Sequence, residues 1–354
     1  MKRNRTLTVL LALVMALLLA YGCAAPAVQP EATPQPQQAT QQPAPTQEAE
    51  PAATPEQAAQ QPLKVAALKG PTGMGMASLM GENEAGNTQQ PYAFTLAAAP
   101  DEIVGKFVNG EVDIAAAPIN LAASLYKKTG GQAVMIAVNT LGVLYVLENG
   151  DTVQSMADLA GKTLYATGQG STPEYVLHYL LEKNGILDQV TVEYYTEHAE
   201  LASLLAAGEA NLGLLPEPNV TATMLKNQDL RIALNLTQEW DKVAGGTKLV
   251  QGCIIAQKSL VESNPQAVAT FLEEYAASVE AVNNDPAAAG ALIEKYEIMA
   301  SAAAAAKAIP NANIVCLTGE EMKQDASAML QVLFDADPKS VGGELPDDGL
   351  YYLG

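Results

Sequence analysis

One pattern of strand, glycine-rich turn and helix occurs twice in this chain, 98 residues apart. The first copy spans residues 64–81 and the second spans residues 162–181. The correspondence continues along the chain, since Gly110 falls on Gly208 and Pro118 on Pro216. Strands that alternate with helices form parallel sheets covered by helices, and a repeat of this length indicates duplicated units. The sequence therefore predicts an α/β fold with two similar βαβαβ lobes.

Two further β-rich segments predict where the chain crosses between the lobes. Residues 141–147 lead out of the first copy, and residues 249–255 follow Gly245-Gly246 and lead into helical sequence. Two crossings imply that the C-terminal part completes the first lobe. We expect lobe 1 to contain residues 63–143 and 250–354, and lobe 2 to contain residues 144–249 with the hinge crossings. Asn264-Pro265 is typical of a helix start, and Asp285-Pro286 of its end.

The N-terminus has the features of a secretory signal peptide. Three basic residues among the first five precede an apolar run at 9–20 that is short for a membrane span. Gly22-Cys23 then resembles a lipobox, although Ala20 stands where Leu is usual. We expect cleavage after residue 22 and lipidation of Cys23, the alternative being plain cleavage with a free thiol.

Residues 23–62 are predicted to be a lipidated tether. Of residues 24–62, 11 are Ala, 10 are Gln and 9 are Pro. Such a segment buries little apolar surface and cannot propagate a helix. The chain is then exported and held by lipid at the outer face of the cytoplasmic membrane, where a long tether suits the wall of a Gram-positive cell.

Composition argues against several classes of function. The chain has 39 acidic and 19 basic residues, whereas nucleic-acid binding relies on clustered Lys and Arg. Cys253 and Cys316 form no CxxC motif and no Cys/His cluster, which argues against a structural zinc site. We therefore expect no metal, no cofactor and no nucleic-acid partner. Two unpaired, buried cysteines are favoured, with a disulfide as the alternative.

An ordered set of short motifs resembles the solute-binding lipoproteins of ABC importers, in the nitrate, sulfonate, taurine and thiamine-precursor branch. The motifs are LKGPTGMG at 68–75, NGEVDIA at 109–115, DLAGKT at 158–163, GSTPEY at 170–175 and LPEP at 215–218. The resemblance covers essentially residues 63–354. It implies a type II periplasmic-binding-protein fold, in which two lobes joined by a two-strand hinge close on a ligand. It also implies a monomer that serves a permease and an ATPase subunit.

The candidate ligand-binding residues follow the predicted strands or lie at the crossings. Glycine-rich turns let the backbone approach a small ligand, and the helices that follow offer unpaired N–H groups. The candidates are Lys69, Thr72, Gly73, Asn120, Asn139, Gly170, Ser171, Thr172, Glu217, Asn219 and Gln251. Ordinary tight turns, hinge packing and helix capping are the alternatives. As caps we consider Thr72, Asn120, and either Ser171 with Glu174 or Thr172 with Pro173.

The predicted ligand is a small organic solute. Glu217, held between two prolines, favours an amine or another N–H donor. Arg231 is the only arginine beyond the signal peptide, so a sulfate- or phosphate-like ligand is disfavoured. A zwitterion fits better, as does a neutral heterocycle stacked on Tyr145, Tyr165 or Tyr175, although tyrosines are more often part of a core.

Catalysis is not expected. His178 pairs with Glu174 at helical spacing, His198 lies in a polar run, and Ser171 lacks the G-x-S-x-G motif. Similar two-lobed folds do include enzymes, so an enzyme stays an alternative. A ligand-sensing or adhesive surface lipoprotein of the same fold is another.

Overall fold

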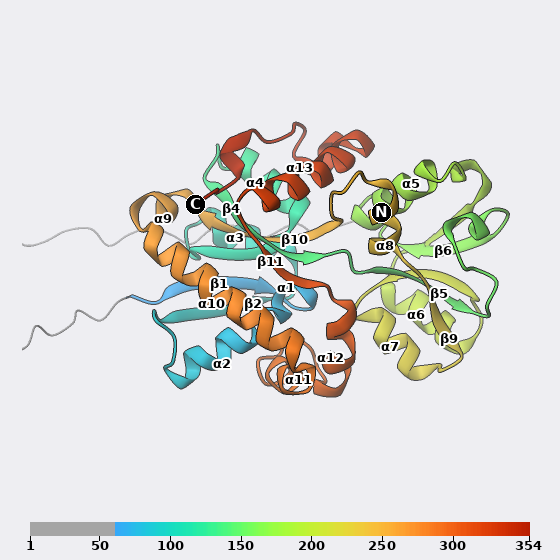
Figure 1. Cartoon of the computed structure of the whole chain (residues 1–354), viewed down its shortest axis with the longest axis horizontal. Coiled ribbons are helices and arrows are strands. Elements are labelled where there is room, and N and C mark those ends of the chain that lie inside the picture. The colour runs from blue at the N-terminus through green and yellow to red at the C-terminus, as the bar shows by residue number, and fades with distance from the viewer. Residues whose placement is uncertain (1–60) are drawn as a thin grey trace, which may run out of the picture. The chain divides into compact units, whose positions relative to one another are not determined.

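Two β-sheets organise the computed structural model, which describes residues 61–354. The predicted signal peptide, Cys23 and the tether up to residue 60 lie outside the described residues. We call the six-stranded sheet with its helices lobe 1, and the five-stranded sheet with its helices lobe 2. Both lobes belong to one compact unit, with lobe 1 on the left and lobe 2 on the right of Figure 1.

Lobe 1 is formed by both ends of the described chain. Its sheet has the order β11-β4-β10-β3-β1-β2, with β1 (Leu63–Leu68), β2 (Tyr92–Ala97), β3 (Ile114–Pro118), β4 (Ala133–Leu141), β10 (Val250–Gln257) and β11 (Ile314–Leu317). Its helices are α1 (Pro71–Met74), α2 (Ala77–Ala85), α3 (Pro100–Val108), α4 (Ile119–Lys128), α9 (Lys258–Ser263), α10 (Pro265–Asn284), α11 (Pro286–Lys295), α12 (Ala302–Ala308) and α13 (Gly319–Ala336). Short 3-10 turns lie at η3 (Ile309–Asn311), η4 (Pro338–Val341) and η5 (Asp348–Leu350).

Lobe 2 is formed by the middle of the chain. Its sheet has the order β7-β6-β8-β5-β9, with β5 (Leu144–Asn149), β6 (Thr163–Thr167), β7 (Thr191–Tyr195), β8 (Leu212–Pro216) and β9 (Leu230–Asn235). Its helices are α5 (Thr172–Lys183), α6 (His198–Ala207), α7 (Asn219–Lys226) and α8 (Leu236–Val243), with 3-10 turns η1 (Met156–Leu159) and η2 (Leu187–Gln189).

The predicted α/β fold with two similar lobes is confirmed, and the two sheets correspond strand by strand. In lobe 1, β1 lies between the parallel strands β2 and β3, and in lobe 2, β6 lies between the parallel strands β7 and β8. The next strand is antiparallel in both sheets: β10 beside β3 and β5 beside β8. The chain crosses from β4 to β5 and returns to β10, which gives the two-strand hinge. The exact lobe limits at residues 143/144 and 249/250 remain our proposal.

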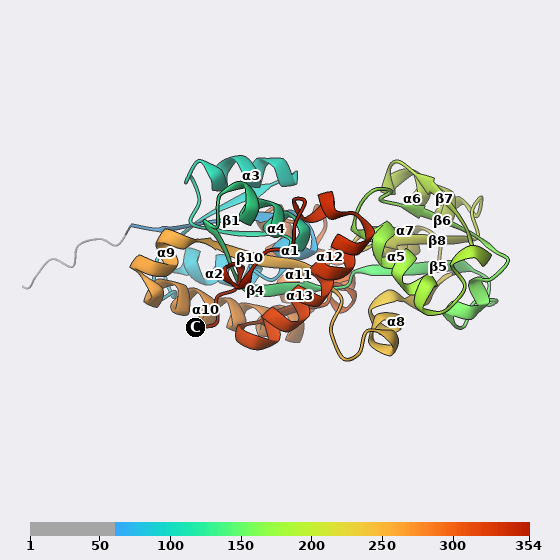
Figure 2. The ribbon, with the colours of Figure 1, turned by 90° about the horizontal axis from the view of Figure 1, so that it is seen from above.

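Alternating side chains bury both faces of each sheet. Along β5, Val146 packs into the cluster that contains α5 and α8, whereas Tyr145 and Leu147 pack against α6 and α7. Figure 2 shows α6 and α8 on opposite sides of the strands of lobe 2. The α5/α8 cluster continues into lobe 1, where it includes residues of α4 and α13, while α2 and α10 cover the other face of the lobe 1 sheet. Each lobe is therefore a three-layer sandwich, with helices on both faces of its sheet.

Strand direction brings the predicted loops to facing edges. Because β4 runs towards the hinge and β10 is antiparallel to both β4 and β3, strands β3 and β1 end on the side of lobe 2. Because β5 leads away from the hinge and is antiparallel to β8, strands β8, β6 and β7 end on the side of lobe 1. The loops after the parallel strands of each lobe therefore face the other lobe, which is where α/β folds commonly bind ligands.

Several local predictions can be compared with the structure. The Asn264 side chain accepts a hydrogen bond from the N–H of Ala267 and caps α10, which ends at Asn284 as predicted. Both cysteines are unpaired; Cys253 is buried, but Cys316 is only half-buried, so the expectation of full burial is wrong for Cys316. No helix within residues 61–354 has the length and apolarity needed to cross a membrane. The same residues contain no cluster of three or more His, Cys, Asp and Glu side chains that could hold a metal ion.

Candidate functional site

The lobe 1 edge is organised around the buried Asn139 side chain. Its Nδ2 donates to the carbonyl oxygen of Thr72 at 3.0 Å, and its Oδ1 accepts from the Thr140 hydroxyl at 3.2 Å. A Cβ at Gly252 would lie 2.7 Å from Asn139 Oδ1 and 3.3 Å from Thr72 Cγ2, so this glycine is needed for close packing. Thr72 and Asn139, two of the predicted site residues, are therefore in direct contact where α1 packs against β4 and β10.

Helix starts at this edge differ from the predicted caps. The N-cap residue of α1 is Gly70, and that of α4 is Pro118, so the cap interpretations of Thr72 and Asn120 are wrong. Each helix begins earlier than predicted because the preceding glycine or proline already takes the cap position. The Thr72 and Asn120 side chains are half-buried and are not used as caps.

The other predicted lobe 1 residues have different environments. Gly73 is buried, and a Cβ there would collide with the carbonyl oxygen of Leu68, so packing explains this glycine. Lys69 is exposed and lines a cavity of about 440 Å³ together with Glu294 and Glu297. Gln251 is half-buried, and its Oε1 is buried without a hydrogen-bond partner among residues 61–354. A buried oxygen without a donor is costly, so Gln251 is suited to accept a hydrogen bond from a ligand.

The lobe 2 edge begins with the turn between β6 and α5. Ser171 is the N-cap residue and Glu174 is at N3, which agrees with one of the two predicted cap assignments, but the reciprocal capping bonds do not form. The Ser171 hydroxyl donates to the carbonyl oxygen of Gly168 at 2.6 Å, and the Glu174 carboxylate accepts from the N–H of Gly170 at 2.5 Å. Ser171 and Gly170 are exposed, whereas Thr172 is buried at the start of α5. The exposed turn is accessible to a small molecule.

Glu217 lies at the end of β8 and its carboxylate is already hydrogen-bonded. It accepts from the Thr221 hydroxyl at 2.9 Å, the Thr221 N–H at 3.2 Å and Asn311 Nδ2 at 3.1 Å. Only 3% of Glu217 is exposed, and this burial raises the pKa of its carboxyl group above the ordinary value. The three hydrogen bonds donated to the carboxylate act in the opposite direction but are outweighed. Asn219, the first residue of α7, is half-buried, and its carbonyl oxygen accepts from Thr223. The Glu217 contact with Asn311 of η3 joins the two lobes.

The three candidate tyrosines are all in contact with protein groups. Tyr145 is buried, and its hydroxyl donates to the carbonyl oxygen of Asn311 at 2.7 Å. Tyr165 packs edge-on against Tyr195, with ring centroids 5.8 Å apart. Tyr175 reaches Asp337 at 3.4 Å and lines a cavity of about 690 Å³ between α5 and α13. Tyr145 is thus a core residue and not an exposed ring on which a ligand could stack.

Two residues of the facing edges were not predicted. His198, the first residue of α6, has its Nδ1 2.6 Å from the hydroxyl of Thr167, the last residue of β6. Asn311 contacts both Tyr145 and Glu217 from the other lobe. The 98-residue offset was a usable signal for His198, since it falls on Pro100 at the start of α3. Asn311 had no comparable signal because it lies in a short turn outside the repeat.

Three loops of the lobe 2 edge contain no positively charged side chain. The residues between β6 and α5, β7 and α6, and β8 and α7 include Glu197 and Glu217 but no Lys or Arg. Arg231 is used elsewhere, where it donates to Glu148 and to the carbonyl oxygens of Gly150 and Val153. This edge therefore offers backbone N–H groups, hydroxyls and one imidazole to a ligand.

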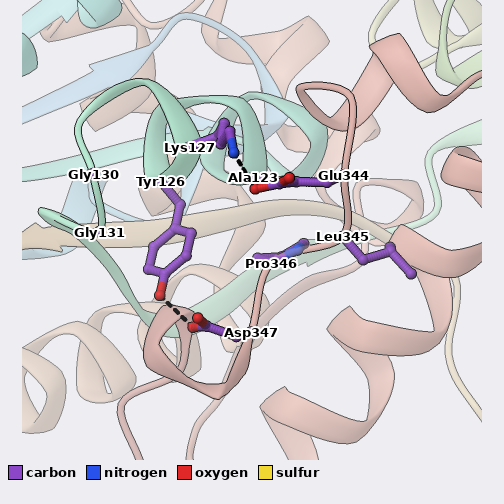
Figure 3. A pocket seen from close by; sticks show the side chains of 9 residues that line it. All are labelled: Ala123, Tyr126, Lys127, Gly130, Gly131, Glu344, Leu345, Pro346 and Asp347. Carbon is purple, nitrogen blue, oxygen red and sulfur yellow. Dashed lines mark hydrogen bonds and ion pairs between the residues drawn. The ribbon is translucent and has the colours of Figure 1, made fainter.

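A further cavity lies away from the facing edges. It has a volume of about 340 Å³ and lies between α4 and residues 344–347. Figure 3 shows Tyr126 pointing towards Asp347 and Lys127 towards Glu344, and both pairs are hydrogen-bonded. None of the predicted ligand-binding residues lines it.

Solved structures with the same architecture define the class of fold. An ABC transporter from Parabacteroides distasonis is 25% identical, with 82% of this chain and 98% of that chain covered and a TM-score of 0.70. The periplasmic aliphatic sulphonate binding protein SsuA from Escherichia coli is 16% identical, with 79% and 90% covered and a TM-score of 0.62. A putative sulfonate ABC transporter's periplasmic sulfonate-binding protein SsuA, from Methylobacillus flagellatus, is 14% identical, with 82% and 90% covered and a TM-score of 0.57. The chain thus has the periplasmic-binding-protein fold, as the motifs implied.

The family follows from the sequence match. The family model described as NMT1/THI5 like matches residues 107–289, which is just over half of the chain. The chain belongs to the NMT1/THI5-like family, and the suspected family relationship is confirmed. No curated protein was found to match the sequence.

Proposed function

We propose that this chain is the extracytoplasmic solute-binding component of an ABC importer. It binds one small organic molecule between the facing edges of its lobes, closes around it and docks on a permease that an ATPase subunit drives. A ligand raises the population of the closed form only as far as it prefers that form. The observation that supports this proposal is that polar, partly accessible loops follow the parallel strands of both lobes and face each other. Solute-binding proteins share this fold.

The ligand-binding residues of the proposal are the predicted set, with unequal roles. Thr72, Gly170, Ser171 and Gln251 have accessible or unpartnered polar groups at the facing edges. Asn139 donates a hydrogen bond to the backbone of Thr72, and Gly73 allows the lobe 1 turn to pack closely against Leu68. Glu217 is already bonded by Thr221 and Asn311, so a ligand amine reaches its carboxylate only by displacing Asn311.

The proposed ligand class is a zwitterion or a neutral heterocycle. Sulfonate- or taurine-like, nitrate-like and thiamine-precursor-like solutes are the candidates, and two structural relatives carry sulfonate-binding names. The absence of Lys and Arg from the three lobe 2 loops disfavours a simple anion, because an unpaired buried charge is costly. Taurine and heterocyclic precursors therefore fit this edge better than nitrate does.

The proposed location is the outer face of the cytoplasmic membrane of a Gram-positive cell, where Cys23 carries the lipid and the protein acts as a monomer. This rests on the signal peptide, lipobox and tether pattern. Mass spectrometry of the mature N-terminus tests it: a diacylated Cys23 is expected, whereas a free Cys23 thiol contradicts it.

A thermal-shift screen of the full-length chain tests the proposed function. The panel contains taurine, alkanesulfonates, nitrate, thiamine, its pyrimidine precursor and amino acids. A ligand at 100 times its Kd adds about 2.7 kcal/mol to the free energy of unfolding, which raises the Tm by several degrees for lobes of this size. Ser171→Ala should reduce the shift. Ser327→Ala is the matched control, because its hydroxyl also donates to a carbonyl oxygen three residues earlier but lies on α13.

An experiment in the cell distinguishes the importer role from the sensor role. Deleting the gene should abolish uptake of the responding solute. Unchanged uptake together with a lost transcriptional response would contradict the importer role and support a sensor.

A further inference from the structure

His198 lies beside the predicted ligand-binding turn of lobe 2. It begins α6, three residues after the end of β7, and β7 is parallel to β6, so its position is on the edge that faces lobe 1. Its Nδ1 is 2.6 Å from the hydroxyl of Thr167, and Thr167 directly precedes the turn at residues 168–171. The imidazole is therefore hydrogen-bonded to the residue that leads into the turn.

The hydrogen bond to Thr167 determines which ring nitrogen carries the proton. Only 1% of Thr167 is exposed, and among residues 61–354 its hydroxyl has no other hydrogen-bond partner than His198 Nδ1. A buried hydroxyl that cannot donate leaves its proton unsatisfied, which is costly. The Thr167 hydroxyl therefore donates, Nδ1 accepts, and the proton of the neutral ring is on Nε2.

The surroundings of the ring favour its uncharged form. Burial lowers the pKa of His198 from its ordinary value, and the nearby Glu197 opposes this only in part. The ring is half-buried, and its Nε2 has no hydrogen-bond or ion-pair partner among residues 61–354. Lobe 2 thus presents a neutral N–H donor at the edge where its loops contain no Lys or Arg.

We infer that the Nε2–H of His198 binds the solute and selects for a hydrogen-bond acceptor on it. The chemical class is an organic solute with a carbonyl oxygen, a ring nitrogen, or a sulfonate or carboxylate oxygen balanced by a positive charge on the same molecule. A neutral donor discriminates against ligands that lack an acceptor at this point, because the donor would then stay unpaired. The inference rests on the proposed function and adds a specificity-determining residue to its site.

The first measurement needs no ligand. Nitrogen-15 NMR of the full-length chain, with His178→Asn to assign the two imidazoles, reports the protonation of each ring nitrogen. The expected result at pH 7 is a neutral His198 with an unprotonated Nδ1 and a protonated Nε2. A charged ring, or a proton on Nδ1, would overturn the inference.

The second measurement uses two substitutions that separate the nitrogens. At position 198, an Asn side chain places its amide group where Nδ1 of the imidazole lies. The longer Gln side chain places an amide N–H where Nε2 of the imidazole lies. With taurine, thiamine and its pyrimidine precursor as probes, His198→Asn should lower affinity at least tenfold, and His198→Gln should stay within about threefold of the wild type. His178→Asn on exposed α5 is the control and should not change affinity.

The outcomes distinguish this inference from the proposed function. Equal affinity of the wild type and His198→Asn, with an unchanged Tm, overturns the role of His198 and leaves the proposed function intact. If the wild type binds no probe, the proposed function fails and the inference fails with it.

Discussion

Asn311 of lobe 1 donates its side-chain N–H to the Glu217 carboxylate of lobe 2 at 3.1 Å, although the two residues are 94 positions apart. The same Asn311 accepts the Tyr145 hydroxyl at 2.7 Å through its carbonyl oxygen. Glu217 and Tyr145 are both nearly fully buried. These contacts join the lobes on the side of α12 and α7.

Asn311→Ala should loosen the contact between the lobes. It removes one donor from the buried Glu217 carboxylate, which costs about 1–3 kcal/mol of stability, and it should increase the radius of gyration in solution scattering. Asn283→Ala is the matched control, because Asn283 also donates one amide hydrogen bond, to Ile314, but within lobe 1. A larger radius in both variants, or in neither, would count against this role.

Glu217 should make stability depend on pH in the direction opposite to that of an ordinary salt-bridged carboxylate. Burial raises its pKa in the folded chain, so the folded state favours the protonated group. Its contribution is fully present below the unfolded pKa and is lost as the pH rises through the folded value. Urea unfolding of the wild type and Glu217→Ala from pH 4 to 7 measures this. The stability of the wild type relative to the variant should fall as the pH rises, and a difference that stays constant or grows would contradict this role of Glu217.

Arg231 should be important for the stability of lobe 2 and not for ligand binding. Its guanidinium group contacts the buried Glu148 carboxylate and two carbonyl oxygens, so Arg231→Met leaves a buried charge unpaired and should cost about 3 kcal/mol. Lys127→Met removes an ion pair whose side chains are more than half exposed and should cost less than about 1 kcal/mol. Equal Tm values for the two variants would refute this assignment.

The Arg231 contact also has a pH signature. Burial opposes ionisation of Glu148, but hydrogen bonds from Thr152 and Val153 and the nearby Arg231 hold its pKa below the ordinary value overall. A lowered folded pKa gives stability that is present above the unfolded pKa and is lost as the pH falls. Acid titration of the Tm should therefore reduce the difference between the wild type and Arg231→Met below pH 4. A difference that persists unchanged would contradict the role of the Glu148 charge.

Gly142 should be intolerant of a side chain because of the hinge packing. A Cβ there would lie 2.5 Å from Leu249 Cδ2 and closer still to the Thr237 hydroxyl, so the β4–β5 crossing and the return to β10 are packed against each other. Gly142→Ala should lower the Tm by several degrees. Gly105→Ala on α3 has open space around the new Cβ and should be neutral or slightly stabilising. A neutral Gly142→Ala would show that the hinge relaxes easily.

The fold was predictable because its signals are local and repeated. Glycine turns after β1 and β6, and the prolines that end β3 and β8, recur at one fixed offset, and strand periodicity identifies the two crossings. The helix starts were less accurate. Gly70 and Pro118 take the cap positions of α1 and α4, ahead of Thr72 and Asn120, and neither cap makes a side-chain hydrogen bond. Gly70 adopts a positive φ of 90° that glycine tolerates, whereas the ring of Pro118 holds its φ at −58°.

The site was predictable only in outline. Loop positions follow from topology, but side-chain partners depend on which strands are neighbours. His198 meets Thr167 because β7 lies beside β6, and Glu217 meets Asn311 because a turn after α12 reaches the other lobe. Neither pairing leaves a signal in the spacing of the residues.

Hydrogen–deuterium exchange with and without the responding compound tests most directly whether one solute is held between the two lobes. Binding between the lobes predicts slower exchange both in residues 70–75 of lobe 1 and in residues 168–172 of lobe 2, with no change at residues 126–131 beside the cavity of Figure 3. Protection confined to one lobe, or to the residues around that cavity, would contradict it.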